Sequence, residues 1–267
     1  MSTSPGSAGR AGVVREIALC LGLYGLYTVT RLWASGAYPA AARNALDVLH
    51  VEHLLGLDIE RAVNHALSPV TWVSVASSYW YATMHFIVTP LMLVLLYRYR
   101  HDVYRVARTA LMGATFFALL GYFFFPTAPP RLLRGYDYID TVASTARYGW
   151  WPSQEALDTG AGAATNQFAA MPSMHVGWAL WVSIVLAVLV RRRWLKVLAF
   201  TYVTATTVVV VLTGNHWVLD AVAGGALVAA AWGLATWYER TTQGAREPEP
   251  ALVAADQALD ESVARSG

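Results

Sequence analysis

Apolar residues occur along this chain in six long blocks that are separated by shorter polar segments. The blocks cover residues 14–33, 70–97, 106–125, 174–190, 194–213 and 216–238. Each is close to the roughly 20 residues that an α-helix needs to cross a bilayer, although the fourth is shorter. Because the blocks are apolar on every side, a helix is the structure that satisfies their backbone in lipid. The pattern predicts an all-α integral membrane protein with six transmembrane helices.

The segment between the first two blocks, residues 40–67, has a different pattern. Its leucine, isoleucine and alanine residues are interspersed with the charged residues Asp47, Glu52, Asp58, Glu60 and Arg61. This pattern is typical of amphipathic helices and predicts one or two of them on the outer surface. Three histidines of the segment are expected on the polar face, namely His50, His53 and His65. A packed extracellular cap and a role in lipid gating both remain open for this segment.

Both ends of the chain are predicted to be disordered. Residues 1–12 are rich in Ser, Gly and Ala, and residues 241–267 are rich in Glu, Pro, Ala and Ser. Segments of this kind bury too little apolar surface to fold. The residues between them, 13–240, are predicted to form one membrane domain. The first block is long enough to stay in the protein as a helix, so no cleaved signal sequence is expected.

The composition supports a membrane protein and restricts its partners. Of 267 residues, 56% are hydrophobic and 13% charged, and the mean hydropathy is +0.41, which is too apolar for an ordinary soluble domain. Cys20 is the only cysteine, so disulfides and cysteine metal clusters are excluded. The chain has no basic stripe with interleaved aromatic residues, which argues against a nucleic-acid partner. The preference for arginine over lysine, with abundant alanine, indicates a GC-rich bacterial genome.

The positions of the basic residues predict how the spans are oriented. They cluster in the turns between spans two and three and between spans four and five, as Arg98, Arg100, Arg105 and Arg108 and as Arg191, Arg192, Arg193 and Lys196. The positive-inside rule places both turns, and with six spans both termini, in the cytoplasm. The segments that precede spans four and six then face the outside. Trp33, Trp72 and Trp217 are expected in the outer aromatic belt.

Two histidines stand at the outer ends of these last spans. His175 follows Met171-Pro172-Ser173-Met174, and His216 opens the segment Gly-Asn-His-Trp-Val-Leu-Asp. On a helix, residues i and i+4 share one face, so the Asp220 carboxylate can reach the His216 ring. A histidine oriented by a carboxylate acts as a base or a nucleophile, and a second histidine supplies a proton. The two segments therefore predict one shared site at the outer face.

Phosphate-binding groups are expected around this pair. Ser173 is a typical N-cap residue, and Asn215 precedes the other helix in a similar way. The start of a helix offers free N–H groups and a positive dipole end, which suits a phosphate. The proline-rich turn after span three delivers Arg131 to the same level, where its guanidinium can bind phosphate oxygens in pairs. Arg134 is a second candidate, although a single outer-loop arginine more often contacts a headgroup or an acidic side chain.

These motifs, in this order, resemble the type 2 phosphatidic acid phosphatase superfamily. Arg131 stands in the first motif, Pro172-Ser173-Met174-His175 in the second, and His216 to Asp220 with Gly224 in the third. The Pro-Pro-Arg turn and the Gly-Asn-His-Trp-x-x-Asp segment are similar to the inositolphosphotransferase branch, which includes inositol phosphorylceramide synthases. The resemblance covers about residues 40–225.

The resemblance implies a metal-independent, cofactor-free reaction on a lipid phosphate or diphosphate. In it, His216 attacks phosphorus and forms a phosphohistidine, while Asp220 orients its ring. His175 protonates the leaving oxygen and then activates the acceptor, which is water or an alcohol such as inositol or a sugar. Arg131 and the two helix starts hold the phosphoryl oxygens.

The chain departs from the common motifs of the superfamily at three places, and at one of them Met174 replaces the frequent glycine of the second motif. The usual lysine ahead of the first-motif arginine is missing, since the only lysine is Lys196. Val209 and Val210 stand where a Ser-Arg pair is common. The missing cations at the first and third motifs favour the lipid transferase branch over a simple phosphatase. Arg134 and Arg147 are left open as replacements for the missing cations.

Three further features of the chain allow more than one interpretation. His85 lies within span two, and a structural role is favoured because no carboxylate stands one helical turn away. Residues 126–172 form a long outer loop, which is typical of a lid or binding element, and Trp150 and Trp151 within it are favoured as interface anchors.

A transporter with a histidine path and a scaffold with a degenerate site are the alternative functions. The chain shows neither an internal repeat nor paired broken helices, which argues against a transporter.

Overall fold

The computed structural model describes residues 38–158 and 167–244, together with single positions between residues 18 and 29. The N-terminal lead, most of the first predicted span and residues 245–267 lie outside the described residues. Within the described part, helices are the regular elements, and one isolated parallel bridge joins Thr127 and Ala169. The predicted all-α class is confirmed for this part of the chain.

Four helices of the described residues are long and apolar enough to cross a membrane: α4 (Thr71–Tyr99), α5 (His101–Phe124), α9 (Arg193–Leu212) and α10 (Val218–Gly244). A fifth, α8 (Met174–Leu189), is equally apolar but shorter, with 16 residues. Each of the five corresponds to a predicted block. The count of six spans stays a prediction, because the first block is outside the described residues.

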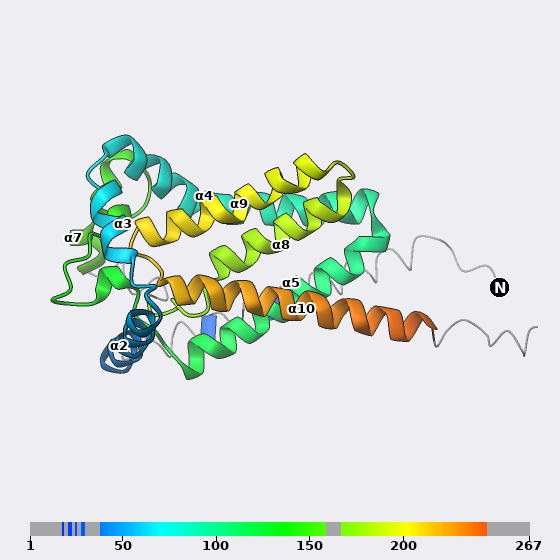
Figure 1. The fold of residues 1–267 in the computed structure, drawn as a ribbon, viewed down its shortest axis with the longest axis horizontal. Helices are drawn as coiled ribbons and strands as arrows, with labels where there is room; N and C mark the ends of the chain where they lie inside the picture. Colours follow the sequence, from blue (N-terminus) through cyan, green and yellow to red (C-terminus); the bar gives the residue numbers. More distant parts are fainter. Residues whose placement is uncertain are drawn as a thin grey trace, which may run out of the picture.

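The long helices run side by side along the longest axis of the molecule (Figure 1). In the same view, α2 (Tyr38–Leu55), α3 (Glu60–Leu67) and α7 (Gln154–Asp158) gather at one end of this bundle, which we call the cap end. The turns that join α4 to α5 and α8 to α9 both lie at the opposite end. The arginine-rich turns therefore share one end of the bundle, as their sequence predicted.

Helix α8 lies between α9 and α10, and α5 packs on α10. Small residues make the close approach of α5 possible, since Ala107, Ala110 and Ala114 are fully buried at the contact. The indole of Trp181 fills the core there and donates a hydrogen bond to the carbonyl oxygen of Ala107 at 2.7 Å. These contacts hold α5 and α8 together inside the bundle.

The amphipathic segment forms two helices, α2 and α3, as predicted, but two of its acidic residues are not on a polar face. Glu52 and Glu60 are both 0% exposed. The prediction for Trp217 is also wrong, because its indole is fully buried in the cap and donates to the carbonyl oxygen of Ala128 rather than lying in an outer aromatic belt. All three side chains are buried by contacts between segments far apart in sequence. Such contacts cannot be predicted from the helical periodicity of one segment.

Candidate functional site

The structure brings the two predicted histidines together at the cap end of the bundle. His175 lies in the first turn of α8, and His216 lies two residues before α10. The distance between His216 Nε2 and His175 Nδ1 is 3.4 Å, and the ring centroids are 5.5 Å apart. His216 is buried, with 3% of its surface exposed. The two sequence segments therefore form one compact site.

A backbone carbonyl determines which nitrogen of His216 faces this site. His216 Nδ1 lies 2.9 Å from the carbonyl oxygen of Ala170, which can only accept a hydrogen bond. Nδ1 is therefore the donor, and Nε2 presents its lone pair to His175. The predicted contact with Asp220 exists, but its Oδ2 is 3.4 Å from Nδ1 and also accepts the N–H of Trp217 at 2.9 Å. Sequence reasoning missed Ala170, because a carbonyl has no side-chain signature.

The starts of α8 and α10 cross closely behind the histidine pair. The N–H of Ser173 donates to the carbonyl oxygen of Asp220 at 2.8 Å, and the Ser173 side chain accepts from Val176, as an N-cap should. A Cβ atom on Gly224 would lie 2.0 Å from the carbonyl oxygen of Ser173. Only glycine fits at this crossing, which explains the Gly224 of the third motif in physical terms.

Arg131 lies beside the residue that precedes His216. Its backbone N–H donates to the carbonyl oxygen of Gly214 at 2.9 Å, and its Nε donates to Asn215 Oδ1 at 2.8 Å. Its Nη1 donates to Asp140 Oδ2 at 3.0 Å, and this ion pair is only 13% and 12% exposed. The proline turn thus delivers the predicted arginine, with Asn215 holding the guanidinium in place.

The other candidate arginines have different partners. The guanidinium of Arg134 lies 5.2 Å from the ring centroid of Tyr38, and that of Arg147 lies 4.6 Å from the ring centroid of Tyr148. Val209 and Val210, where a Ser-Arg pair is common, are buried apolar residues. Arg131 is therefore the candidate arginine that the structure places next to His216.

Two residues of α4 surround His175, and only one of them was considered from the sequence. Tyr81 stacks on the His175 ring with centroids 4.2 Å apart and an interplanar angle of 20°. His85 meets the same ring edge-on, with centroids 4.4 Å apart and an angle of 74°. Residues 81 and 85 are one helical turn apart, so their spacing was a signal that could have paired them.

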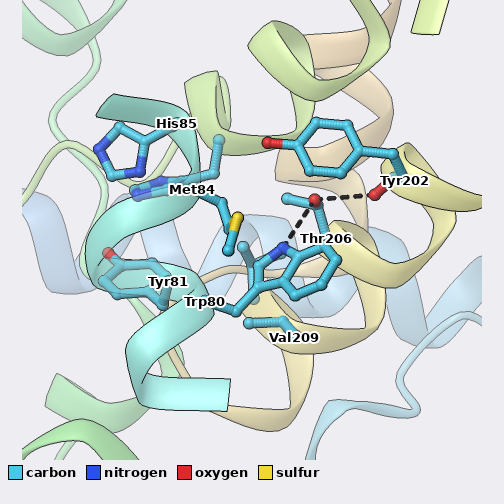
Figure 2. A pocket seen from close by; sticks show the side chains of 9 residues that line it. Trp80, Tyr81, Met84, His85, Tyr202, Thr206 and Val209 are labelled. Carbon is cyan, nitrogen blue, oxygen red and sulfur yellow. Dashed lines mark hydrogen bonds between the residues drawn. The ribbon is translucent and has the colours of Figure 1, made fainter. Parts of the chain in front are cut away.

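A pocket lies between α4 and α9 (Figure 2), and His175 is one of the residues that line it. The enclosed space is small, with room for about one water molecule. Trp80 Nε1 donates to Thr206 Oγ1 at 3.1 Å across it. The pocket is lined by Trp80, Tyr81, Met84, His85, His175, Tyr202, Thr206, Val209 and Val210.

The two helix starts differ in the donors that they leave free. In α10, the N–H groups of Trp217, Val218 and Leu219 already donate to Asp220, Glu60 and Glu52. The expectation that both helix starts bind phosphate is therefore wrong for α10. In α8, no partner for the N–H groups of Met174 and His175 is found among the described residues. An anion at the site would meet the start of α8.

Comparison with known proteins identifies similar chains. The family model of the PAP2 superfamily matches residues 46–234, which is well over half of the chain. Among solved structures, the crystal structure of Aquifex aeolicus LpxE is similar, with a TM-score of 0.52 and 19% sequence identity. The match covers 68% of this chain and 94% of the LpxE chain, and at this identity the likeness concerns the fold. No curated protein matches.

Proposed function

This chain belongs to the PAP2 superfamily, and on that premise we propose that it is a membrane enzyme that cleaves a phosphate ester or diphosphate of a lipid through a phosphohistidine. The observation that carries this proposal is the histidine pair. Nε2 of His216 presents a lone pair toward His175 at 3.4 Å, while Nδ1 is held by the carbonyl oxygen of Ala170. One ring is thus oriented as a nucleophile and the other as a proton donor.

The first half-reaction forms a nitrogen–phosphorus bond. His216 Nε2 attacks phosphorus, the bond from phosphorus to the lipid oxygen breaks, and His175 gives that oxygen its proton. The positive charge that develops on the His216 ring is stabilised by Asp220, whose Oδ2 lies 3.4 Å from Nδ1. In the second half-reaction, His175 takes a proton from the acceptor, whose oxygen attacks phosphorus as the nitrogen–phosphorus bond breaks. The enzyme returns to its starting protonation state.

Arg131 and the start of α8 are the groups that hold the phosphoryl oxygens in this proposal. The Arg131 guanidinium is fixed by Asn215 and Asp140, so it is oriented before the substrate arrives. The first turn of α8 adds the free backbone N–H groups of Met174 and His175, which can donate to phosphoryl oxygens. Ser173 and Asn215 act mainly as supports: Ser173 caps α8, and Asn215 orients Arg131.

The site is proposed to face the outside of a bacterial cell membrane. It lies at the cap end, and the turns with Arg98, Arg100 and Arg191–Arg193 lie at the other end (Figure 1). By the positive-inside rule, that other end belongs in the cytoplasm. A lipid in the outer leaflet can then present its phosphate to the histidines while its chains stay in the membrane.

Transfer to an alcohol is the second candidate, and the burial of the nucleophile favours it. His216 is 3% exposed, and Tyr81 covers one face of His175. A phosphohistidine in such a place is shielded from bulk water, so an alcohol bound at the site competes well with water as the acceptor. The similarity of the Pro-Pro-Arg and Gly-Asn-His-Trp-x-x-Asp segments to inositolphosphotransferases points in the same direction.

Purified protein in lipid nanodiscs tests the proposal. Phosphatidate, isoprenyl diphosphate and phosphatidylinositol are offered with and without inositol or a sugar, and free phosphate is measured against transferred product. We expect activity that survives EDTA and falls at least about 1,000-fold in His216→Gln, because the nucleophile is lost. His53→Gln, a change of an exposed histidine in the cap, is the matched control and keeps its activity.

An activated aryl phosphate separates the two histidine roles. Its leaving group needs no proton, so His175→Gln should still form the phosphohistidine and then stall, which acid-labile phosphate on the protein would report. His216→Gln should form none. Folded variants that both keep full phosphate release would refute the proposal and leave a transporter or a scaffold as the better interpretation.

A further inference from the structure

Three carboxylates from three segments bind the first turn of α10. Glu52 Oε1, on α2, accepts the N–H of Leu219 at 2.7 Å, and Glu60 Oε1, on α3, accepts the N–H of Val218 at 2.8 Å. Asp220 Oδ2 accepts the N–H of Trp217 at 2.9 Å. All three acidic side chains are 0% exposed. The helix that follows His216 is thus fixed by side chains about 160 residues away in sequence.

Among the described residues, no N–H or hydroxyl group donates to the buried second oxygen of any of the three: Glu52 Oε2, Glu60 Oε2 and Asp220 Oδ1. The carboxyl groups of Glu52 and Glu60 are close enough to share a hydrogen bond when one of them is protonated. No group of three or more acidic, histidine or cysteine side chains in the described part of the chain is placed to hold a metal ion. A helix start carries only about half of a positive charge. Three ionised carboxylates at one helix start would therefore repel one another with little compensation, and a proton is the simplest way to reduce their charge.

We propose that Glu52 and Glu60 are positioning residues of the phosphoryl-transfer site, which seat the first turn of α10 and thereby hold His216 and Asp220 in place. This inference rests on the proposed function. It differs from a plain structural role, because the two residues act on the charge beside His216 as well as on its position. Neither residue touches the substrate.

The protonation of the pair follows from its surroundings. Burial, with the neighbouring carboxyls of Glu60 and Asp220, raises the pKa of Glu52 to about 8, and burial also raises the pKa of Glu60. The titratable group of α10 that faces the pair is Asp220. Tyr138 also lies near the pair, and its own pKa is raised by burial and by both glutamates, with Arg61 and Asp58 as the other charges around it. At neutral pH Glu52, with its pKa near 8, therefore holds a proton.

Ionisation of Glu52 gives this arrangement a pH dependence with a definite sign. The folded protein holds the proton up to about pH 8, while an unfolded glutamate releases it near 4.5. Stability from this group is therefore complete below pH 4.5 and is lost as the pH rises toward 8. Above pH 8 the negative charge of ionised Glu52 repels Asp220 and weakens the contacts that hold the first turn of α10 in place. The activity should therefore fall along an alkaline limb as the pH rises past about 8.

Substitutions at Glu52 test the inference. Glu52→Gln keeps an oxygen acceptor for Leu219 and mimics the protonated acid, so kcat at pH 7 should stay within about threefold. The alkaline limb should disappear or move by at least one pH unit. Glu52→Ala removes the acceptor and should lower kcat at least about tenfold with KM within twofold, because substrate contacts are untouched. Asp47→Asn, an exposed acid on the same helix, is the matched control and should match the wild type throughout.

The pH profiles and kcat values of these variants can each overturn the inference. An alkaline limb that is the same in Glu52→Gln as in the wild type overturns the inference, as does a folded Glu52→Ala with unchanged kcat. Should Glu52→Ala fail to fold, the pH profile of Glu52→Gln and the matching Glu60→Gln variant decides alone. A wild-type protein without phosphoryl-transfer activity would instead refute the proposed function, and with it the role assigned to the two glutamates.

Discussion

At the scale of single residues, two acceptors lie near Nδ1 of His216, and one of them is clearly closer than the other. The carbonyl oxygen of Ala170 is 2.9 Å from Nδ1, and Asp220 Oδ2 is 3.4 Å from it. The carbonyl fixes the tautomer in which Nε2 carries no proton, so under the proposed mechanism we expect Asp220 to be needed chiefly for its charge. This division of roles has a measurable consequence.

Replacing Asp220 by Asn should be less harmful than the same change in a serine-protease triad, where the wrong tautomer costs about 10⁴-fold. Asparagine can still accept the N–H of Trp217, and Ala170 still orients the His216 ring. We expect kcat to fall by about 10- to 100-fold, from the lost stabilisation of the charged ring, with the phosphohistidine still formed. A loss near 10⁴-fold in single-turnover assays would show that Asp220, rather than Ala170, sets the tautomer.

The guanidinium of Arg131 makes bonds that an ammonium group cannot reproduce. Its Nε and Nη1 donate to Asn215 and Asp140, and the fork geometry leaves further N–H groups for the phosphate. Arg131→Lys should therefore lower kcat/KM about 100-fold, or ~2.7 kcal/mol of transition-state stabilisation. Arg134→Lys, at an exposed arginine over Tyr38, should change it less than about threefold. Equal effects in the two variants would argue against Arg131 as the phosphate-binding arginine.

Several residues of the site could be predicted from the sequence, because their signals are local. His175, His216 and Asp220 stand at helix starts with helical spacing, and the proline turn marks Arg131. The burial of Glu52 and Glu60 could not be predicted, since it depends on contacts with residues more than 150 positions away. Helical periodicity describes one helix against its surroundings and does not identify which second helix will cover a charged residue.

At the scale of the elements, helix boundaries differ from prediction where polar residues continue or interrupt a helix. Helix α5 begins at His101 rather than near residue 106, because its polar first turn, in which Arg100 pairs with Asp102, is helical rather than a loop. Helix α10 begins at Val218 rather than 216, since carboxylates take up its first N–H groups. Helix α8 begins at Met174 as predicted, with Ser173 as its cap.

The crossing of α8 and α10 gives a prediction at this scale. Gly224→Ala would place a Cβ 2.0 Å from the carbonyl oxygen of Ser173, which is backbone and cannot turn aside. The helices must separate, so we expect activity to be lost and stability to fall by at least ~1–3 kcal/mol, the usual cost of overpacking. Gly225→Ala, whose Cβ would meet only a Leu180 methyl at 3.7 Å, is the matched control. Thermal unfolding and phosphate release measure both effects, and similar behaviour of the two variants would contradict the crossing.

At the scale of the whole molecule, the outer loop predicted as a lid or binding element is partly tied to the cap. Asn64 of α3 accepts the N–H of Ile139 at 2.8 Å and donates to the carbonyl oxygen of Leu212 at 2.7 Å. Trp151 is 8% exposed and packs edge-on against Tyr79, whereas Trp150 is 67% exposed. Asn64 therefore ties both the loop between α5 and α8 and the end of α9 to α3.

The two ends of the bundle should meet different solutions, and cysteine labelling measures this directly. In a Cys20→Ser background, which removes the only native cysteine, Leu55→Cys places one thiol at the exposed cap and Arg192→Cys places one at the opposite turn. A membrane-impermeant maleimide should label the first in intact cells and the second only after permeabilisation, because the positive-inside rule holds the arginine turn in the cytoplasm. Phosphate release by each variant controls for folding. The reverse labelling pattern would place the histidine pair on the cytoplasmic side, and the lipid phosphate that it meets would then belong to the inner leaflet.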